Sequence, residues 1–238
     1  MSGVRPARGL PEPDERFCVS WSGGKDSCLA LHRARAAGAR PVALLTLLVE
    51  DGSRTRSHGL RREVVEAQAE SLGLPLLAAP TSWATYEERL IGLLDEARAL
   101  GSTAAVFGDI DVEAHGHWET RVSRAAGLRA RLPLWRTPRR SLLEDWWRLG
   151  FEARIVVVRA SELEPELLGR ALDPCLAGEI ERRGLDPCGE NGEFHTIAVD
   201  GPGFRAGLAL APGARVRRGG VWALDVRLSR NDRAAVPP

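Results

Sequence analysis

Residues 19–34 read VSWSGGKDSCLALHRA, and this stretch decides the fold. It begins within an apolar run at residues 16–21, turns at Gly23 and Gly24, and continues as a helical pattern that ends at Gly38. Paired glycines allow a tight connection between a strand and a helix. We therefore predict a strand–turn–helix unit, the building block of α/β proteins.

The same alternation continues along the chain. Apolar runs predict strands at residues 41–49, 74–80, 103–110, 128–135 and 151–160, and amphipathic patterns predict helices at 60–73, 85–101, 117–127 and 141–150. This order predicts an α/β fold with a doubly wound, mostly parallel sheet. After about residue 161, Gly/Pro turns separate runs that are typical of antiparallel strands, so we expect a smaller C-terminal α+β region.

Composition narrows the class of protein. The 44% hydrophobic and 27% charged residues are typical of a globular chain, and a net charge of +1 argues against broad binding to nucleic acid. No apolar run approaches the ~20 residues that cross a bilayer. We expect a cytoplasmic protein with a disordered tail at 1–15, a nucleotide-binding domain at 16–135 and a substrate-binding region at 136–238. The sequence leaves a homodimer open.

The turn after the first predicted strand has the features of a phosphate site. Ligands of doubly wound sheets bind at the carboxyl ends of strands, where backbone N–H groups and a helix N-terminus attract anions. Lys25, the only lysine of the chain, adds a compact positive charge. For the SGG tripeptide alone, a structural turn with a helix cap is an equally good interpretation.

A second stretch, GLDPCGENGEFHTIAVDGPGF at residues 184–204, carries two carboxylates around a glycine. Glu190 and Glu193 are followed by His195 and Thr196. These residue types are suited to binding a substrate and transferring protons. A solvated turn that leads into a hairpin is the alternative, and the residues alone weight the two interpretations about equally.

The two stretches together resemble a known family. SGGKDS is similar to the PP-loop of the ATP pyrophosphatases, and GENGEFHT followed by DGP resembles the GExGEFET signature of the diphthine–ammonia ligases. Further matches are FGDI at 107–110, LPLW at 132–135 and LGRALD at 168–173, so the resemblance covers residues 17–230. His195 stands where that family usually carries a glutamate.

The resemblance implies an adenine nucleotide alpha hydrolase-like fold and a reaction. ATP is cleaved between its α and β phosphates, a carboxylate on a small molecule or a protein is adenylated, and ammonia converts it to an amide. The implied cofactors are ATP and Mg²⁺, with Asp26 as the ligand of the metal.

The resemblance also implies a set of site residues. The nucleotide would contact Ser20, Ser22, Gly23, Gly24, Lys25, Asp26, Ser27, His58, Gly108 and Asp109. The implied catalytic residues are Lys25, Asp26, Glu190, Glu193 and His195. The acceptor would contact Gly189, Glu190, Asn191, Gly192, Glu193 and Thr196.

Other functions are weighed against this one. Bacteria lack diphthamide, and the preference for arginine over lysine suggests a GC-rich bacterial genome, so another acceptor, such as a cobalamin-related carboxylate, is considered. An RNA-modifying PP-loop enzyme is disfavoured because the sequence has no CxxC pair, and a non-enzymatic nucleotide-binding protein is disfavoured by the intact SGGKDS. His115, His117 and Glu113 form a weak metal pattern that is better explained as a helix start.

Overall fold

The computed structural model describes residues 9–229, which form two compact units. The first unit comprises Met1–Ser22, Asp26–Ser57 and Leu74–Pro138, and the second comprises Gly23–Lys25, His58–Gly73 and Arg139–Pro238. Of the predicted disordered tail, residues 1–8 lie outside the described residues. Glu15 is buried and pairs with Arg129 at 2.7 Å and with Arg131 at 3.0 Å.

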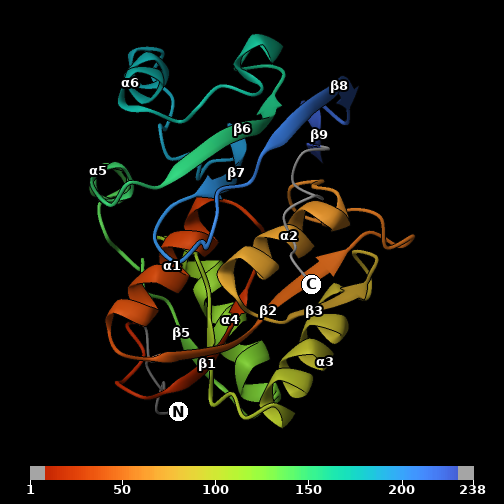
Figure 1. Cartoon of the computed structure of the whole chain (residues 1–238), viewed down its shortest axis with the longest axis vertical. Helices are drawn as coiled ribbons and strands as arrows, with labels where there is room; N and C mark the ends of the chain where they lie inside the picture. The colour runs from red at the N-terminus through yellow and green to blue at the C-terminus, as the bar shows by residue number, and fades with distance from the viewer. Residues whose placement is uncertain (1–8, 230–238) are drawn as a thin grey trace. The chain divides into compact units, whose positions relative to one another are not determined.

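A five-stranded parallel sheet forms the centre of the first unit (Figure 1). Its order is β3-β2-β1-β4-β5, with β1 at Arg16–Ser20, β2 at Arg40–Leu48, β3 at Leu76–Pro80, β4 at Ala104–Val106 and β5 at Arg129–Arg131. This arrangement confirms the predicted doubly wound fold. The strand order reverses between β1 and β4, and the crevice at such a point is where ligands of α/β sheets bind.

The described residues of this unit contain three helices: α1 at Lys25–Ala36, which begins with a residue of the second unit, α3 at Tyr86–Ala99 and α4 at Glu113–Ala125. Leu90, Leu93, Leu94 and Val122 of α3 and α4 are buried in one cluster with Cys18 and other residues of the sheet. Helix α4 begins before the predicted residue 117, so His115 and His117 lie on its first turns. The short β4 and β5 end before FGDI and LPLW, which are irregular.

The second unit contains a four-stranded antiparallel sheet in the order β7-β6-β9-β8. Its strands are β6 at Glu152–Arg159, β7 at Phe194–Asp200, β8 at Leu210–Arg218 and β9 at Val221–Leu228. Up to residue 229, four helical segments accompany it: α2 at Arg62–Leu72, α5 at Arg139–Arg148, the 3₁₀ helix η1 at Pro165–Leu167 and α6 at Pro174–Arg182. The predicted C-terminal α+β region is therefore present.

The interpretation of residues 151–160 as a continuation of the parallel alternation was wrong. Strand β6 pairs antiparallel with β7 on one side and β9 on the other. Ile155, Val156 and Val158 are all buried, so the middle of β6 is covered on both faces, whereas Glu152 and Arg154 at its start are exposed. Such a continuous apolar run is more typical of a buried parallel strand, so the sequence pattern could not distinguish the two. Within residues 9–229, no helix is both long and apolar enough to cross a membrane.

Candidate functional site

The outer edge of β7 holds the glycine turn of the SGGKDS loop. Strand β7 is at the edge of its sheet, so alternate backbone groups have no strand partner on that side. The N–H of Ala198 donates to the carbonyl of Gly23 at 2.9 Å. The side-chain amide of Gln68, on α2, donates to the carbonyls of Gly23 at 2.9 Å and Ala198 at 2.7 Å, and this side chain is fully buried. The turn is thus fixed to the strand that carries the second motif.

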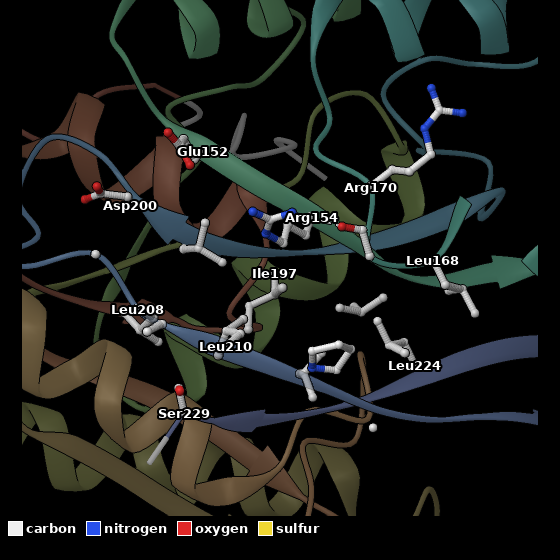
Figure 2. Close-up of a pocket in the computed structure, with 18 of the residues that line it drawn as sticks. Glu152, Arg154, Leu168, Arg170, Ile197, Asp200, Leu208, Leu210, Leu224 and Ser229 are labelled. Carbon is white, nitrogen blue, oxygen red and sulfur yellow. Dashed lines mark hydrogen bonds between the residues drawn. The ribbon is translucent and has the colours of Figure 1, made fainter. Parts of the chain in front are cut away.

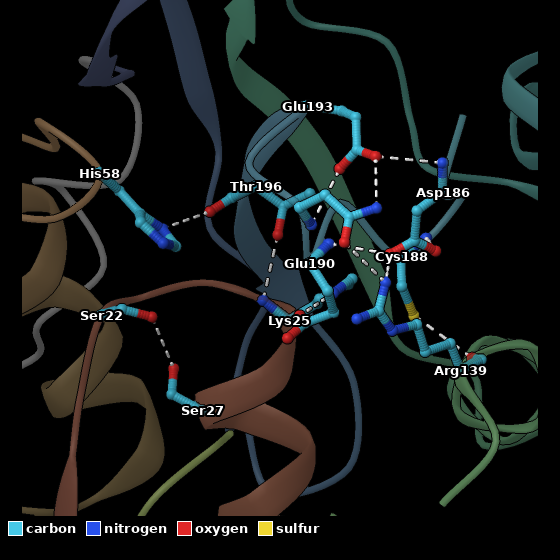
Figure 3. Close-up of polar contacts among 11 residues, drawn as sticks. Ser22, Lys25, Ser27, His58, Arg139, Asp186, Cys188, Glu190, Glu193 and Thr196 are labelled. Atoms are coloured by element: carbon cyan, nitrogen blue, oxygen red, sulfur yellow. Dashed lines mark hydrogen bonds and ion pairs between the residues drawn. The ribbon is translucent and has the colours of Figure 1, made fainter. Parts of the chain in front are cut away.

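Lys25 follows this turn, and both its backbone and its side chain make polar contacts with the second motif (Figure 3). Its backbone N–H donates to the hydroxyl of Thr196 at 3.1 Å, and its ammonium lies 3.8 Å from a carboxylate oxygen of Glu190. The side chain is only 5% exposed. Just before it, a Cβ on Gly24 would lie 2.5 Å from the His58 ring, so this position requires glycine. The structure therefore brings together Lys25, Glu190 and Thr196, which the sequence predicted for one site.

His58 and His195 form a stacked pair beside Lys25. Their ring centroids are 4.7 Å apart at an interplanar angle of 17°, and Nδ1–H of His58 donates to the Thr196 carbonyl at 3.0 Å. Burial, the neighbouring His195 and Lys25 together lower the pKa of His58 to about 3, although its bond to Thr196 opposes this shift. Burial, Lys25 and Arg159 also lower the pKa of His195. Both rings are therefore neutral near pH 7.

The two glutamates of the second motif have different surroundings. Glu193 is buried and accepts three hydrogen bonds, from the backbone of Asp186 and from the backbone and side chain of Asn191, at 3.0–3.2 Å. The carboxylate of Glu193 therefore stabilises the conformation of its own loop. Glu190 instead presents its carboxylate to Lys25.

A further carboxylate, Asp186, holds Glu190 in place. Its side chain accepts from the N–H of Cys188 at 2.9 Å, from the N–H of Glu190 at 3.0 Å and from the guanidinium of Arg139 at 2.7 Å. The same guanidinium donates to the Asn191 side chain at 3.2 Å. Sequence reasoning missed Asp186, Arg139 and Gln68. Only Asp186 had a local signal, since an Asp-Pro pair before glycines favours a turn closed by the Asp side chain.

Of the remaining predicted residues, Gly189 and Gly192 lie in the second unit, in the loop before β7. The others lie in the first unit, at the end of β1, in the first turn of α1 or in the loops after β1 and β4: Ser20, Ser22, Asp26, Ser27, Gly108 and Asp109. The hydroxyls of Ser22 and Ser27 are 3.2 Å apart. A Cβ on Gly108 would lie 2.8 Å from the backbone of Asp26 and Ser27, so the FGDI loop passes against the start of α1. The glycine at this position permits the close approach.

Asp109 bonds to His115 on α4. Nδ1 of His115 lies 2.7 Å from the Asp109 carboxylate. Burial raises the pKa of Asp109, but the bonds with His115 and Glu119 outweigh it, so the pKa is lowered overall. His117 lies 3.8 Å from Glu113. Within residues 9–229, no group of three or more His, Cys, Asp or Glu side chains could hold a metal ion.

Two models of one protein family match most of the chain. The diphthamide synthase N-terminal domain matches residues 15–130, and the diphthamide synthase C-terminal domain matches residues 139–227. The chain belongs to the diphthamide synthase family. The family and the fold predicted from the sequence are thereby confirmed, and so is the enzyme class at the level of the family, an ATP-dependent, amide-forming ligase.

Known relatives are similar to this chain over most of its length. The chain is 28% identical over 211 residues to the diphthine–ammonia ligase of Schizosaccharomyces pombe, covering 79% of this chain and 35% of that protein. It is 28% identical over 222 residues to the human diphthine–ammonia ligase and 27% identical over 231 residues to that of Rattus norvegicus. These matches cover 80% of both chains for the human protein and 82% of both for the rat protein. The chain thus spans about a third of the yeast relative.

Replacing Gln68 by methionine should destabilise this member of the diphthamide synthase family and loosen its loop. The buried carbonyl of Ala198 would lose its donor, which costs about 2 kcal/mol of unfolding free energy. Urea denaturation measures this loss, and hydrogen exchange of the Lys25 amide should accelerate. Glu66→Gln on the exposed side of α2 is the control, with an expected change within about 0.5 kcal/mol. Equal stability of Gln68→Met and wild type would contradict the assigned clamp.

The neutral His58 predicts a pH dependence of stability. Its pKa is about 3 in the folded protein and about 6.5 when unfolded, so below pH 6.5 the unfolded state gains a proton that the folded state does not. Between pH 6.5 and 5 the unfolding free energy should therefore fall by up to about 2 kcal/mol, less where solvent reaches the ring. Urea denaturation at these two pH values should show a smaller loss for His58→Gln. An equal loss in both proteins would refute the prediction.

Proposed function

We propose that this chain adenylates a carboxylate with ATP and converts the adenylate to an amide with ammonia. A carboxylate oxygen attacks the α-phosphorus and the bond to the β-phosphate oxygen breaks, which releases pyrophosphate. Ammonia then attacks the acyl carbon, AMP leaves, and a base accepts the proton. The observation that carries the proposal is the attachment of the glycine turn and Lys25 to β7, next to Glu190.

The SGGKDS loop would hold the phosphates of ATP. Gly23, at a φ of 81°, and Gly24 bring backbone N–H groups close to an anion, and the N-terminus of α1 adds its positive dipole end. The Lys25 ammonium would neutralise the leaving pyrophosphate, because it is buried beside the turn. The hydroxyls of Ser20, Ser22 and Ser27 would complete this phosphate site in the proposal.

Mg²⁺ is proposed as the companion of ATP. This ion is commonly bound by one or two carboxylates together with the phosphates of a nucleotide. Asp26, which follows Lys25 at the start of α1, supplies a carboxylate in the first turn and fits such a role. The ion would neutralise charge on the phosphates.

The second motif would position the acceptor and move protons. His195 is held neutral by burial and by the positive charges of Lys25 and Arg159, so its imidazole has a free lone pair to accept the proton of the attacking ammonia. Glu190 would orient the Lys25 ammonium. Glu193 and Asn191 bond to each other, which supports a positioning role for both rather than direct chemistry.

The identity of the acceptor is the finer part of the proposal. The relatives are named for diphthine, but His195 replaces the glutamate of the family signature at this point. A histidine that is neutral leaves one negative charge fewer beside the acceptor than a glutamate would. We therefore propose a carboxylate acceptor other than diphthine, on a small molecule or a protein.

Pyrophosphate exchange tests the proposed reaction. The protein is incubated with ATP, Mg²⁺, labelled pyrophosphate and a panel of carboxylic acids, and label should enter ATP only when an acceptor is present. With ammonium added, AMP and pyrophosphate should accumulate in equal amounts. Formation of ADP and phosphate instead would exclude this reaction.

Two substitutions should separate the roles of charge and geometry. Lys25→Arg keeps the charge, but a bulky planar guanidinium fits poorly beside the Gly23–Gly24 turn, so we expect exchange to fall at least about tenfold. Glu190→Gln should reduce exchange while leaving stability within about 0.5 kcal/mol of wild type. Glu193→Gln should instead lower stability by about 2 kcal/mol, because one of its acceptor oxygens becomes a donor facing N–H groups. The reverse pattern for the two glutamates would overturn their assignment.

A further inference from the structure

The antiparallel sheet of the second unit has a hollow on one face that the proposed reaction does not use. The pocket has a volume of about 870 Å³ and is lined by residues of all four strands and of the neighbouring loops (Figure 2). Its floor is made by buried apolar side chains, among them Val156, Ile197, Leu224 and Val226. A cavity of this size accommodates a small organic molecule.

One end of the pocket is acidic. Glu152 and Asp200 are direct cross-strand partners on β6 and β7. Like charges in such a position destabilise a sheet. Among residues 9–229 neither carboxylate forms an ion pair. The Asp200 carboxylate accepts a hydrogen bond from the N–H of Gly201 at 2.8 Å. This end is therefore suited to a cationic group.

Arg215 lies toward the opposite end, whereas Arg154 lies between the two ends, two residues after Glu152 on β6. Arg154 turns its guanidinium toward the carbonyl of Gly169, at 3.1 Å, and Arg215 is the cross-strand partner of Leu224. Within the described part of the chain Arg215 has no ion-pair partner. Figure 2 shows Glu152 and Asp200 on one side of the pocket, Arg170 on the other and Arg154 between them, with apolar side chains such as Ile197 and Leu224 also lining the space.

We propose that this pocket binds a bipolar amphipathic molecule, with an ammonium group at Glu152 and Asp200 and a carboxylate at Arg215. Its aliphatic body would lie on the apolar floor. A simple anion would leave the acidic pair without an ion-pair partner, and a simple cation would leave Arg215 without one. The pocket therefore selects a ligand that carries both charges at a distance. This inference does not depend on the ligase reaction.

The test is a titration of ¹⁵N-labelled protein with 8-aminooctanoate, followed by NMR. We expect shifts of the backbone amides of Ile197, Val199 and Leu224, which line the pocket. Because exposed ion pairs contribute little, a dissociation constant of about 1 mM is expected. Octanoate and octylamine each lack one charged end, so each should bind about fivefold more weakly. Shifts that cluster elsewhere, or equal binding of the three compounds, would overturn the proposal.

Two variants assign the ends of the ligand. Glu152→Gln should weaken the binding of 8-aminooctanoate to the affinity of octanoate, without weakening the binding of octanoate itself. Arg215→Gln should weaken the binding of 8-aminooctanoate to the affinity of octylamine, without weakening the binding of octylamine itself. Arg218→Gln is the matched control, because Arg218 is on the same strand but does not line the pocket. The spectra of all three variants should match wild type away from the substitution, which shows that they fold. Equal weakening by all three would contradict the proposed ends.

Discussion

The hydrogen bond from the Ala198 N–H to the Gly23 carbonyl is the contact on which the site depends. An edge strand offers a row of backbone donors and acceptors, and proteins usually cover such an edge. Here β7 satisfies part of its edge with the glycine turn and with Gln68, which donates to both sides of the joint. If the glycine turn and β7 separated, buried backbone groups on both would lose their hydrogen-bond partners, which lowers the unfolding free energy.

Because the turn is bound to β7, two motifs that are about 170 residues apart act on one another. The Thr196 hydroxyl accepts a hydrogen bond from the Lys25 N–H, and the Thr196 carbonyl accepts one from His58. The loop that immediately precedes β7 carries Glu190. A compact group of charges and rings results, and the positive charge of Lys25 lowers the pKa of both histidines. The electrostatics of the site are thus a consequence of a backbone contact.

The glutamates illustrate the limit of reading a motif. Glu190 and Glu193 flank one glycine and look equivalent in the sequence. In the structure, Glu193 is surrounded by N–H donors of its own loop, whereas Glu190 reaches Lys25. Which carboxylate turns inward depends on Asp186 and Arg139, and Arg139 comes from a helix about 50 residues earlier. A local pattern holds no information about such a partner.

The sequence by itself determined the parallel α/β core, the phosphate-type loop and the family, because hydrophobic periodicity and paired glycines are local properties. It did not determine where β6 would pair, since the continuous apolar run at residues 155–158 is typical of a buried parallel strand but belongs here to an antiparallel one. It also did not identify Gln68, whose role exists only where the turn meets β7. Only the tertiary structure decided these points, because hydrogen-bond partners between distant segments are set by how the chain packs and not by the neighbours of a residue in the sequence.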